Sequence, residues 1–187
     1  MPGIDDKRPF VPLRIAVLTV SDTREPADDK SGATLAERIE KAGHVVAGRA
    51  IATDDVEKIH AQVRTWIADS AIDVIISTGG TGFTGRDVTP EAVEPLFEKR
   101  MDGFSIAFHL VSHAKIGSST IQSRTTAGVA GATFIFCVPG SPGACRDAWD
   151  EILVHQLDYR YRPCNFVELM PRLDEGMLRT KAKGATA

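Results

Sequence analysis

The chain lacks the cysteine patterns that define disulfide frameworks and structural zinc sites. Its three cysteines, Cys137, Cys145 and Cys164, form an odd set without a Cys-x-x-Cys pair. This usage is typical of a reducing compartment, so we expect a cytoplasmic protein. No run of about 18 apolar residues occurs and residues 1–12 have no apolar core, so neither a membrane span nor a signal peptide is expected.

An excess of basic residues is also missing. The 187 residues include 22 Lys and Arg against 25 Asp and Glu, which gives a formal net charge of −3. Lys and Arg are interleaved with acids rather than clustered in a stripe, so a nucleic-acid partner is not expected. No Gly-Lys pair occurs anywhere in the chain, which excludes a Walker A loop.

The sequence does contain a regular alternation of apolar runs and amphipathic segments. Buried strands are predicted at 13–20, 44–52, 72–78 and 133–138, where the runs are short, apolar and β-branched. Helices are predicted at 33–43, 54–67, from 89, over 102–115 and over 141–157, while residues 118–132 read as loop and turns. This alternation predicts a three-layer α/β/α fold with a mainly parallel sheet.

We expect a single domain over residues 13–170, because no linker or internal repeat divides the chain. Residues 1–12 form an N-terminal extension in this interpretation. Residues 171–187 form a C-terminal tail without hydrophobic periodicity, which we expect to be mobile. The 43% hydrophobic content allows one core of ordinary size.

Helix-capping signals follow the predicted strands. Asp54 with Glu57 three residues later has the pattern of a capping box. Thr89-Pro90 and Ser141-Pro142 each place a hydroxyl before a proline, which predicts a helix that begins with the proline.

The stretch STGGTGFTGRDVTPEA, residues 77–92, has four glycines within seven positions. Glycine is costly in conformational entropy, so the cluster indicates a loop whose amides come close to a ligand. A sharp turn without a ligand is the simpler alternative. A third interpretation is the dinucleotide pattern Gly-x-Gly-x-x-Gly at 80–85, but no second strand ending in an acid follows, which disfavours an oxidoreductase.

The predicted parallel sheet would bring four polar segments together. Residues 19–22, 53–55, 79–85 and 139–141 each leave the end of a strand, and ligands bind beyond the carboxyl ends of such strands. Hydroxyls, amides and carboxylates are the groups that hold a phosphate and a hard cation.

Two acids and one pair of histidines keep an alternative role at this point. Asp54 could cap a helix or serve Mg²⁺, and Asp87 could stabilise a turn or contact a metal or substrate. His109 and His113 have a zinc-compatible spacing, but without a visible third ligand packing roles are favoured.

Several motifs taken together resemble the MoaB/MogA family of molybdenum cofactor proteins. The likeness runs from about residue 13 to 170, and its last segment resembles the MoaB branch in particular. The motifs are TVSDTR (19–24), DKSG (29–32), STGGTGFTGRDVTPEA (77–92), SRTTAG (123–128) and PGSPGACRDAWDEILVHQLDYRYRPCNF (139–166).

The resemblance implies a MogA-like fold, assembly as homotrimers or homohexamers, and a reaction. In that reaction molybdopterin and Mg-ATP give adenylylated molybdopterin and pyrophosphate, before a molybdenum-insertion protein acts on the product. The alternative is a non-catalytic molybdopterin-binding paralogue or scaffold on the same fold.

The resemblance also implies roles for individual residues. Asp87 would be the acid that active members need, and Asp54 its Mg²⁺-linked catalytic companion, although alignment could choose Asp55. The pterin and phosphate side would be lined by Thr19, Ser21, Asp22 and Ser123. The nucleotide would be bordered by Gly79, Gly80, Thr81, Gly82, Pro139, Gly140 and Ser141.

Overall fold

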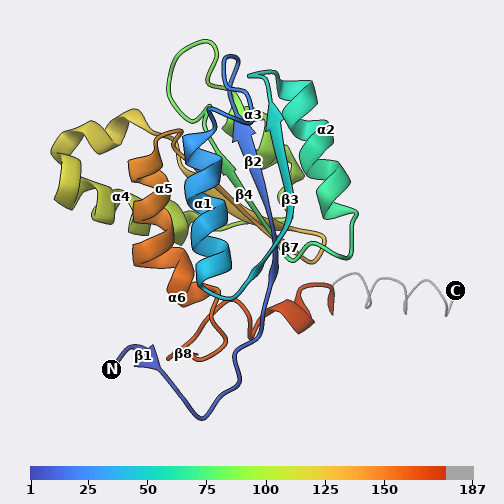
Figure 1. Cartoon of the computed structure of the whole chain (residues 1–187), viewed down its shortest axis with the longest axis vertical. Coiled ribbons are helices and arrows are strands. Elements are labelled where there is room, and N and C mark those ends of the chain that lie inside the picture. Colours follow the sequence, from blue (N-terminus) through green and yellow to red (C-terminus); the bar gives the residue numbers. More distant parts are fainter. Residues whose placement is uncertain (176–187) are drawn as a thin grey trace, which may run out of the picture.

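The computed structural model describes residues 1–175 and is built around a six-stranded sheet of order β3-β2-β4-β7-β6-β5 (Figure 1). Four strands are parallel, as the sequence predicts: β2 (Arg14–Val20), β3 (Val45–Ala52), β4 (Val74–Thr78) and β7 (Thr133–Val138). Two antiparallel strands complete one edge, namely β6 (Thr126–Ala130) and the short β5 (Lys99–Arg100).

Helices cover both faces of the sheet, which confirms the three-layer α/β/α prediction (Figure 1). One face packs against α1 (Lys30–Lys41), α4 (Asp102–Ile116) and α5 (Pro142–Ala148). The other face packs against α2 (Val56–Ile67) and α3 (Thr89–Val93). A π-helical turn, Trp149–Leu153, continues α5 into α6 (Val154–Gln156). Within the described residues, no helix is long and apolar enough to span a bilayer.

The central strand β2 shows why the layers form. Its residues alternate between two hydrophobic clusters, with Ile15 and Val17 on the α1 side and Ala16 and Leu18 on the α2 side. All four side chains are buried. A strand that is apolar on both faces is stable only when helices cover both, as in parallel α/β sheets.

The prediction that residues 118–132 form only loop and turns is wrong, because residues 126–130 form β6. The 3₁₀ helix η2 (Gly117–Gln122) precedes it, and β6 pairs antiparallel with β7. Glycine usually weakens a strand. Here Gly128 makes room for the ring of Phe97, since an added Cβ would lie 2.4 Å from its Cγ.

Two of the three predicted helix caps need correction. Asp55, not Asp54, caps α2 by accepting a hydrogen bond from the Lys58 amide at 3.0 Å. Thr89 is the first residue of α3 and Val88 holds the cap position, while the Thr89 hydroxyl donates to the Gly79 carbonyl at 2.8 Å. Ser141 caps α5 as predicted, accepting from the Ala144 amide at 3.1 Å.

Segments near the two ends of the described chain contact each other. β1 (Gly3–Ile4) pairs antiparallel with β8 (Tyr161–Arg162), at the end of the molecule opposite the strand-end loops (Figure 1). Arg8 also forms an ion pair with Glu168 at 2.6 Å. A short 3₁₀ helix, Met170–Arg172, overlaps the start of the tail expected at 171–187, and residues 176–187 lie outside the described part of the chain.

Candidate functional site

The loops that follow β2, β3, β4 and β7 meet at one end of the sheet and border an open cavity of about 450 Å³. The loops after β2 and β4 project together at the top of Figure 1. This is the gathering at the carboxyl ends that the parallel sheet predicts. Its lining consists of Val20, Ser21, Thr23, Arg24, Asp54, Gly79, Gly80, Thr81, Gly82, Arg86, Asp87, Gln122, Ser123, Pro139 and Gly140.

The glycine-rich loop after β4 passes too close to its neighbours to carry side chains at its start. Gly79 and Gly80 both have positive φ, +105° and +63°. An added Cβ would lie 2.2 Å from the Val20 carbonyl oxygen at Gly79, and 2.4 Å from Thr89 Oγ1 at Gly80. Because only glycine fits here, the loop reaches the cavity as bare backbone.

Arg124 fixes the far part of this loop. Its guanidinium donates to the carbonyl oxygens of Gly82 and Asp87, both at 2.7 Å, and pairs with Glu91. The sequence prediction did not include Arg124, although it lies in SRTTAG beside Ser123. Neither hydrophobic periodicity nor a helix-capping pattern distinguishes this arginine in the sequence. Its role is identified only by its contacts in the folded structure.

Asp87 is held in its ionised form. Burial raises the pKa of this carboxyl, but hydrogen bonds from Thr84 and Gly82 and the charge of Arg124 outweigh it and leave the pKa below its usual range. Thr84 donates to Asp87 Oδ2 from its hydroxyl at 2.6 Å and from its amide at 2.9 Å.

Asp54 has the opposite electrostatic setting. Its pKa lies above the usual range, mainly because of burial and then because of the negative charges of Asp22 and Asp87. Arg86 acts against this rise, but it is engaged with Asp22 through two bonds of 2.7 and 2.6 Å. Asp22 also accepts a hydrogen bond from the Asp54 amide at 3.1 Å. Asp54 therefore lies where negative charge is under-compensated.

The donor set fits a magnesium ion that is shared with a phosphate. Within the described residues, no cluster of three or more His, Cys, Asp or Glu side chains forms a complete metal site. Mg²⁺ is usually held by one or two carboxylates together with substrate phosphates and water. Asp54 and Asp87 line one cavity, so the residue types present fit such an ion, and the charges of Asp22 and Asp87 add to the effect of burial in raising the pKa of Asp54.

Most of the residues that the sequence singled out line this cavity, and three do not. Thr19 is buried and donates to Asp29 Oδ2 at 2.9 Å. Asp22 is at the edge, paired with Arg86, and Ser141 is occupied as the α5 cap. Because Asp55 caps α2, Asp54 is the acid of this turn that reaches the cavity.

The sequence assigns no individual role to five further cavity residues, although one of them lies in the predicted strand-end segment 19–22; they are Val20, Thr23, Arg24, Arg86 and Gln122. Arg24 and Arg86 lie in quoted motifs, TVSDTR and TGRD, but were given no role. The histidine pair makes no metal site within the described residues, and His109 Nδ1 lies 3.0 Å from Thr120 Oγ1.

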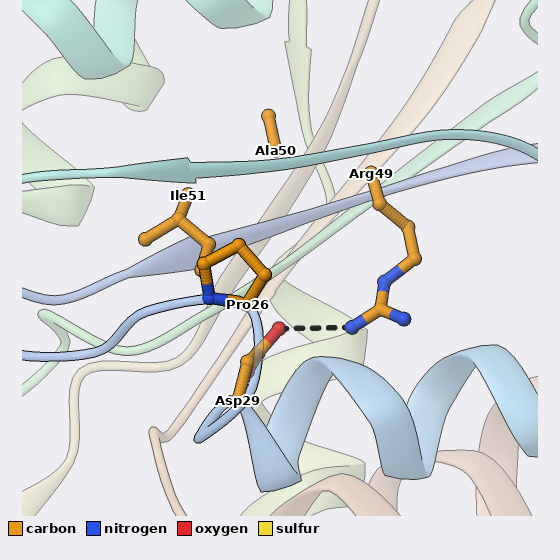
Figure 2. Close-up of a pocket in the computed structure, with 5 residues that line it drawn as sticks. All are labelled: Pro26, Asp29, Arg49, Ala50 and Ile51. Carbon is orange, nitrogen blue, oxygen red and sulfur yellow. Dashed lines mark hydrogen bonds and ion pairs between the residues drawn. The ribbon is translucent and has the colours of Figure 1, made fainter.

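A second cavity, of about 480 Å³, borders the loop after β2 and is lined by Pro26, Asp29, Arg49, Ala50 and Ile51 (Figure 2). Its two charges meet each other, with Arg49 Nη2 3.1 Å from Asp29 Oδ2. Asp29 also caps α1 by accepting from the Gly32 amide at 2.8 Å. These contacts satisfy Asp29 internally, so the pair serves the fold.

Fold and site together define a class, namely α/β proteins with a polar, glycine-lined cavity beyond the carboxyl ends of their parallel strands. A family model described as "Probable molybdopterin binding domain" matches residues 16–159. The chain is 50% identical over 157 residues to molybdenum cofactor biosynthesis protein B of Escherichia coli strain K12, covering 84% of this chain and 92% of that protein. The chain belongs to this family of molybdenum cofactor biosynthesis proteins.

Other relatives agree. The protein of the same name from Bacillus subtilis strain 168 is 40% identical over 151 residues, covering 80% of this chain and 89% of that protein. A crystal structure of molybdenum cofactor biosynthesis protein B superposes with a TM-score of 0.79 at 36% identity, covering 88% of this chain and 98% of that one. These findings confirm the family resemblance and the MogA-like fold that the sequence motifs imply.

Proposed function

We propose that the chain is a molybdopterin adenylyltransferase, which transfers AMP from ATP to molybdopterin and releases pyrophosphate. The observation that carries the proposal is the pairing of Asp87, held ionised, with Asp54 in one cavity beside the bare glycine loop. Family membership supplies molybdopterin as the second reactant.

In the proposed reaction, a phosphate oxygen of molybdopterin attacks the α-phosphorus of ATP, and the bond from this phosphorus to the bridging oxygen of pyrophosphate breaks. Both reactants are anionic, so catalysis depends on alignment and on neutralising charge. Asp54 and Asp87 would hold Mg²⁺, which supplies positive charge to the phosphates when bound. The glycine loop, clamped by Arg124, gives the phosphates a rigid surface to lie against.

A covalent route through either of the two buried cysteines is disfavoured. Burial raises the pKa of the Cys137 thiol to about 12 and that of Cys145 to about 11. Neither forms the reactive thiolate at neutral pH. Direct transfer between the two bound substrates needs no such nucleophile.

Self-association as a homotrimer or homohexamer is part of the proposal. Ile106 and Leu110, four residues apart on α4, are 62% and 69% exposed, and Ile121 on the following 3₁₀ helix is 71% exposed. Exposed large apolar side chains that lie close together are typical of contact surfaces. Light scattering should give a multiple of the 20.2 kDa chain mass, and Leu110→Glu should lower it.

The decisive experiment mixes purified protein with molybdopterin, ATP and Mg²⁺ and measures pyrophosphate release. Wild type should release pyrophosphate, and Asp87→Asn should lower turnover by at least about 100-fold. Asp102→Asn is the matched control, because Asp102 is an exposed acid on α4 outside the cavity. Molybdopterin binding without any pyrophosphate release would refute the transferase and support a scaffold.

A further inference from the structure

Two arginines line the main cavity, and their electrostatic environments differ. Arg86 is neutralised by its two bonds to Asp22. Arg24 forms no ion pair with any carboxylate in the described part of the chain, and both acceptors of its guanidinium hydrogen bonds are neutral. Its Nη1 donates to Ser31 Oγ at 2.8 Å and its Nη2 to the Gly140 carbonyl at 3.0 Å. A cation in a cavity wall without an acid partner points to an anionic ligand.

The local sequence explains how Arg24 reaches this position. Ser21 Oγ accepts hydrogen bonds from the amides of Thr23 and Arg24, both at 3.3 Å, which turns the chain immediately after β2. The turn directs residue 24 back over the strand ends.

The guanidinium is then held by a closed set of three hydrogen bonds. Ser31, fully buried in the first turn of α1, accepts from Arg24 and donates to the Gly140 carbonyl at 2.9 Å. Arg24 completes the set by its own bond to Gly140. The side chain is thus pre-oriented, and less entropy is lost when it binds a ligand.

Arg24 retains donors for such a ligand. A guanidinium carries five N–H groups in a planar fork, and the two bonds to neutral oxygens use only part of them. Bidentate donation to phosphate oxygens is the recognition mode that this geometry favours. Arg49, in the second cavity, differs from Arg24 because its charge is already paired with the carboxylate of Asp29 (Figure 2).

The positive charge of Arg24 and the negative charge of Asp54 lie at different parts of the cavity's rim. Arg24 contacts Gly140 beyond β7, whereas Asp54 follows β3, and β2 and β4 separate these strands in the sheet. A polyphosphate lying across the strand ends could therefore meet the acids through a cation and Arg24 directly.

We propose that Arg24 is a phosphate-binding residue of this site, which recognises a phosphoryl group of the substrates through its free guanidinium edge. This inference rests on the proposed function, since it assigns a residue to the phosphates that the reaction brings. The phosphate could belong to the nucleotide or to the pterin substrate, and the chemistry of recognition is the same.

Titration calorimetry with inorganic pyrophosphate tests the proposal. Arg24→Gln should weaken pyrophosphate binding by at least about tenfold, and Arg24→Lys should weaken it less because it keeps the charge but loses the fork. Arg14→Gln is the matched control, since Arg14 pairs with Asp73 at the opposite end of β2. The affinity of wild type should fall with added salt more steeply than that of Arg24→Gln.

A purely structural role for Arg24 gives a different result. Ser31→Ala removes one support of the guanidinium and keeps the charge, so it should retain most of the pyrophosphate affinity. Equal losses in Ser31→Ala and Arg24→Gln would show that Arg24 acts only by holding the Gly140 loop. If Arg24→Gln does not fold, as judged by circular dichroism, the folded Arg24→Lys and Ser31→Ala variants decide the question.

Further titrations distinguish the source of the phosphate. ADP and adenosine are compared for the nucleotide side, and glycerol 1-phosphate represents a phosphomonoester such as that of the pterin. A selective loss of ADP affinity in Arg24→Gln assigns Arg24 to the nucleotide, and a selective loss of the monoester assigns it to the pterin side.

The inference and the proposed function can fail separately. Unchanged pyrophosphate affinity in Arg24→Gln, or no pyrophosphate binding by wild type, overturns the role of Arg24 even where adenylyl transfer is observed. Arg24-dependent pyrophosphate binding without adenylyl transfer refutes the transferase and leaves the phosphate-binding role intact.

Discussion

Replacing Gly80 with alanine tests whether the glycine loop is required by geometry. Gly80 has φ +63°, and an added Cβ would lie 2.4 Å from Thr89 Oγ1 and 3.1 Å from Asp54 Oδ1. The Thr89 hydroxyl donates to the Gly79 carbonyl at 2.8 Å, so it cannot move aside without losing this buried bond.

The expected cost follows from these contacts. An alanine in the left-handed region costs about 1–2 kcal/mol, and loss of the buried hydrogen bond costs about 1 kcal/mol more. We therefore expect Gly80→Ala to lower the free energy of unfolding by about 2–3 kcal/mol. For a chain of this length, the unfolding midpoint should fall by about 4–12 °C.

Thermal unfolding followed by circular dichroism measures this shift. Gly85→Ala is the matched control within the same loop, because no atom lies within 4 Å of an added Cβ there. Its free energy of unfolding should change by no more than about 0.5 kcal/mol. Equal unfolding midpoints for Gly80→Ala and Gly85→Ala would refute the argument. They would show that the close contacts of an added Cβ are not what requires glycine at position 80.

Three other substitutions test the electrostatics and the clamp. The folded-state pKa of Asp54 is raised, so its contribution to stability is full below the ordinary carboxyl pKa and is lost as pH rises through the folded value. Asp54→Asn should therefore raise the thermal midpoint at about pH 7.5 and have little effect at about pH 3; an unchanged midpoint at both pH values would contradict this. The pKa of Asp87 is lowered, so its contribution is present above the ordinary carboxyl pKa and is lost as pH falls through the folded value. Asp87→Asn should destabilise at about pH 7.5, with the difference shrinking as pH falls below the ordinary carboxyl pKa, and a difference that does not change with pH would speak against ionic stabilisation. Arg124→Gln removes two carbonyl bonds and an ion pair, so urea unfolding should show a loss of about 1–3 kcal/mol, whereas no loss would mean that the clamp is not structural.

The parallel core of the fold could be predicted from sequence because its signals are local. Short β-branched runs gave β2, β3, β4 and β7, and the amphipathic segments between them gave the crossing helices. Because right-handed crossover connections make these strands parallel, the loops at their carboxyl ends must all lie at the same edge of the sheet. The position of the cavity follows from these elements alone.

Features that depend on distant contacts could not be predicted. β6 reads TAGVA, and the reason for Gly128 is a phenylalanine ring about thirty residues earlier in the chain. Asp54 and Asp55 are adjacent acids with equal capping potential. The extended backbone of Asp55, φ −137° and ψ 122°, makes it the cap, and this depends on how the loop after β3 leaves the sheet.

In the site too, some features could be predicted from local sequence signals and others depend on distant contacts. The alternation of β2 places Thr19 on the face of Ile15 and Val17, so its burial could have been inferred from the strand period. The roles of Arg24 and Arg124 could not, because both arginines reach carbonyl oxygens on loops distant in the sequence, in addition to the side chains of Ser31 and Glu91. Backbone acceptors leave no signal in side-chain identity.

The most direct test of the account is a crystal structure with molybdopterin, Mg²⁺ and an ATP analogue that cannot be cleaved between its α- and β-phosphates. The account predicts electron density for the phosphates in the 450 Å³ cavity, between the glycine loop and Arg24, with the ion beside Asp54 and Asp87. Phosphates bound in the Asp29–Arg49 cavity or elsewhere on the surface would contradict it.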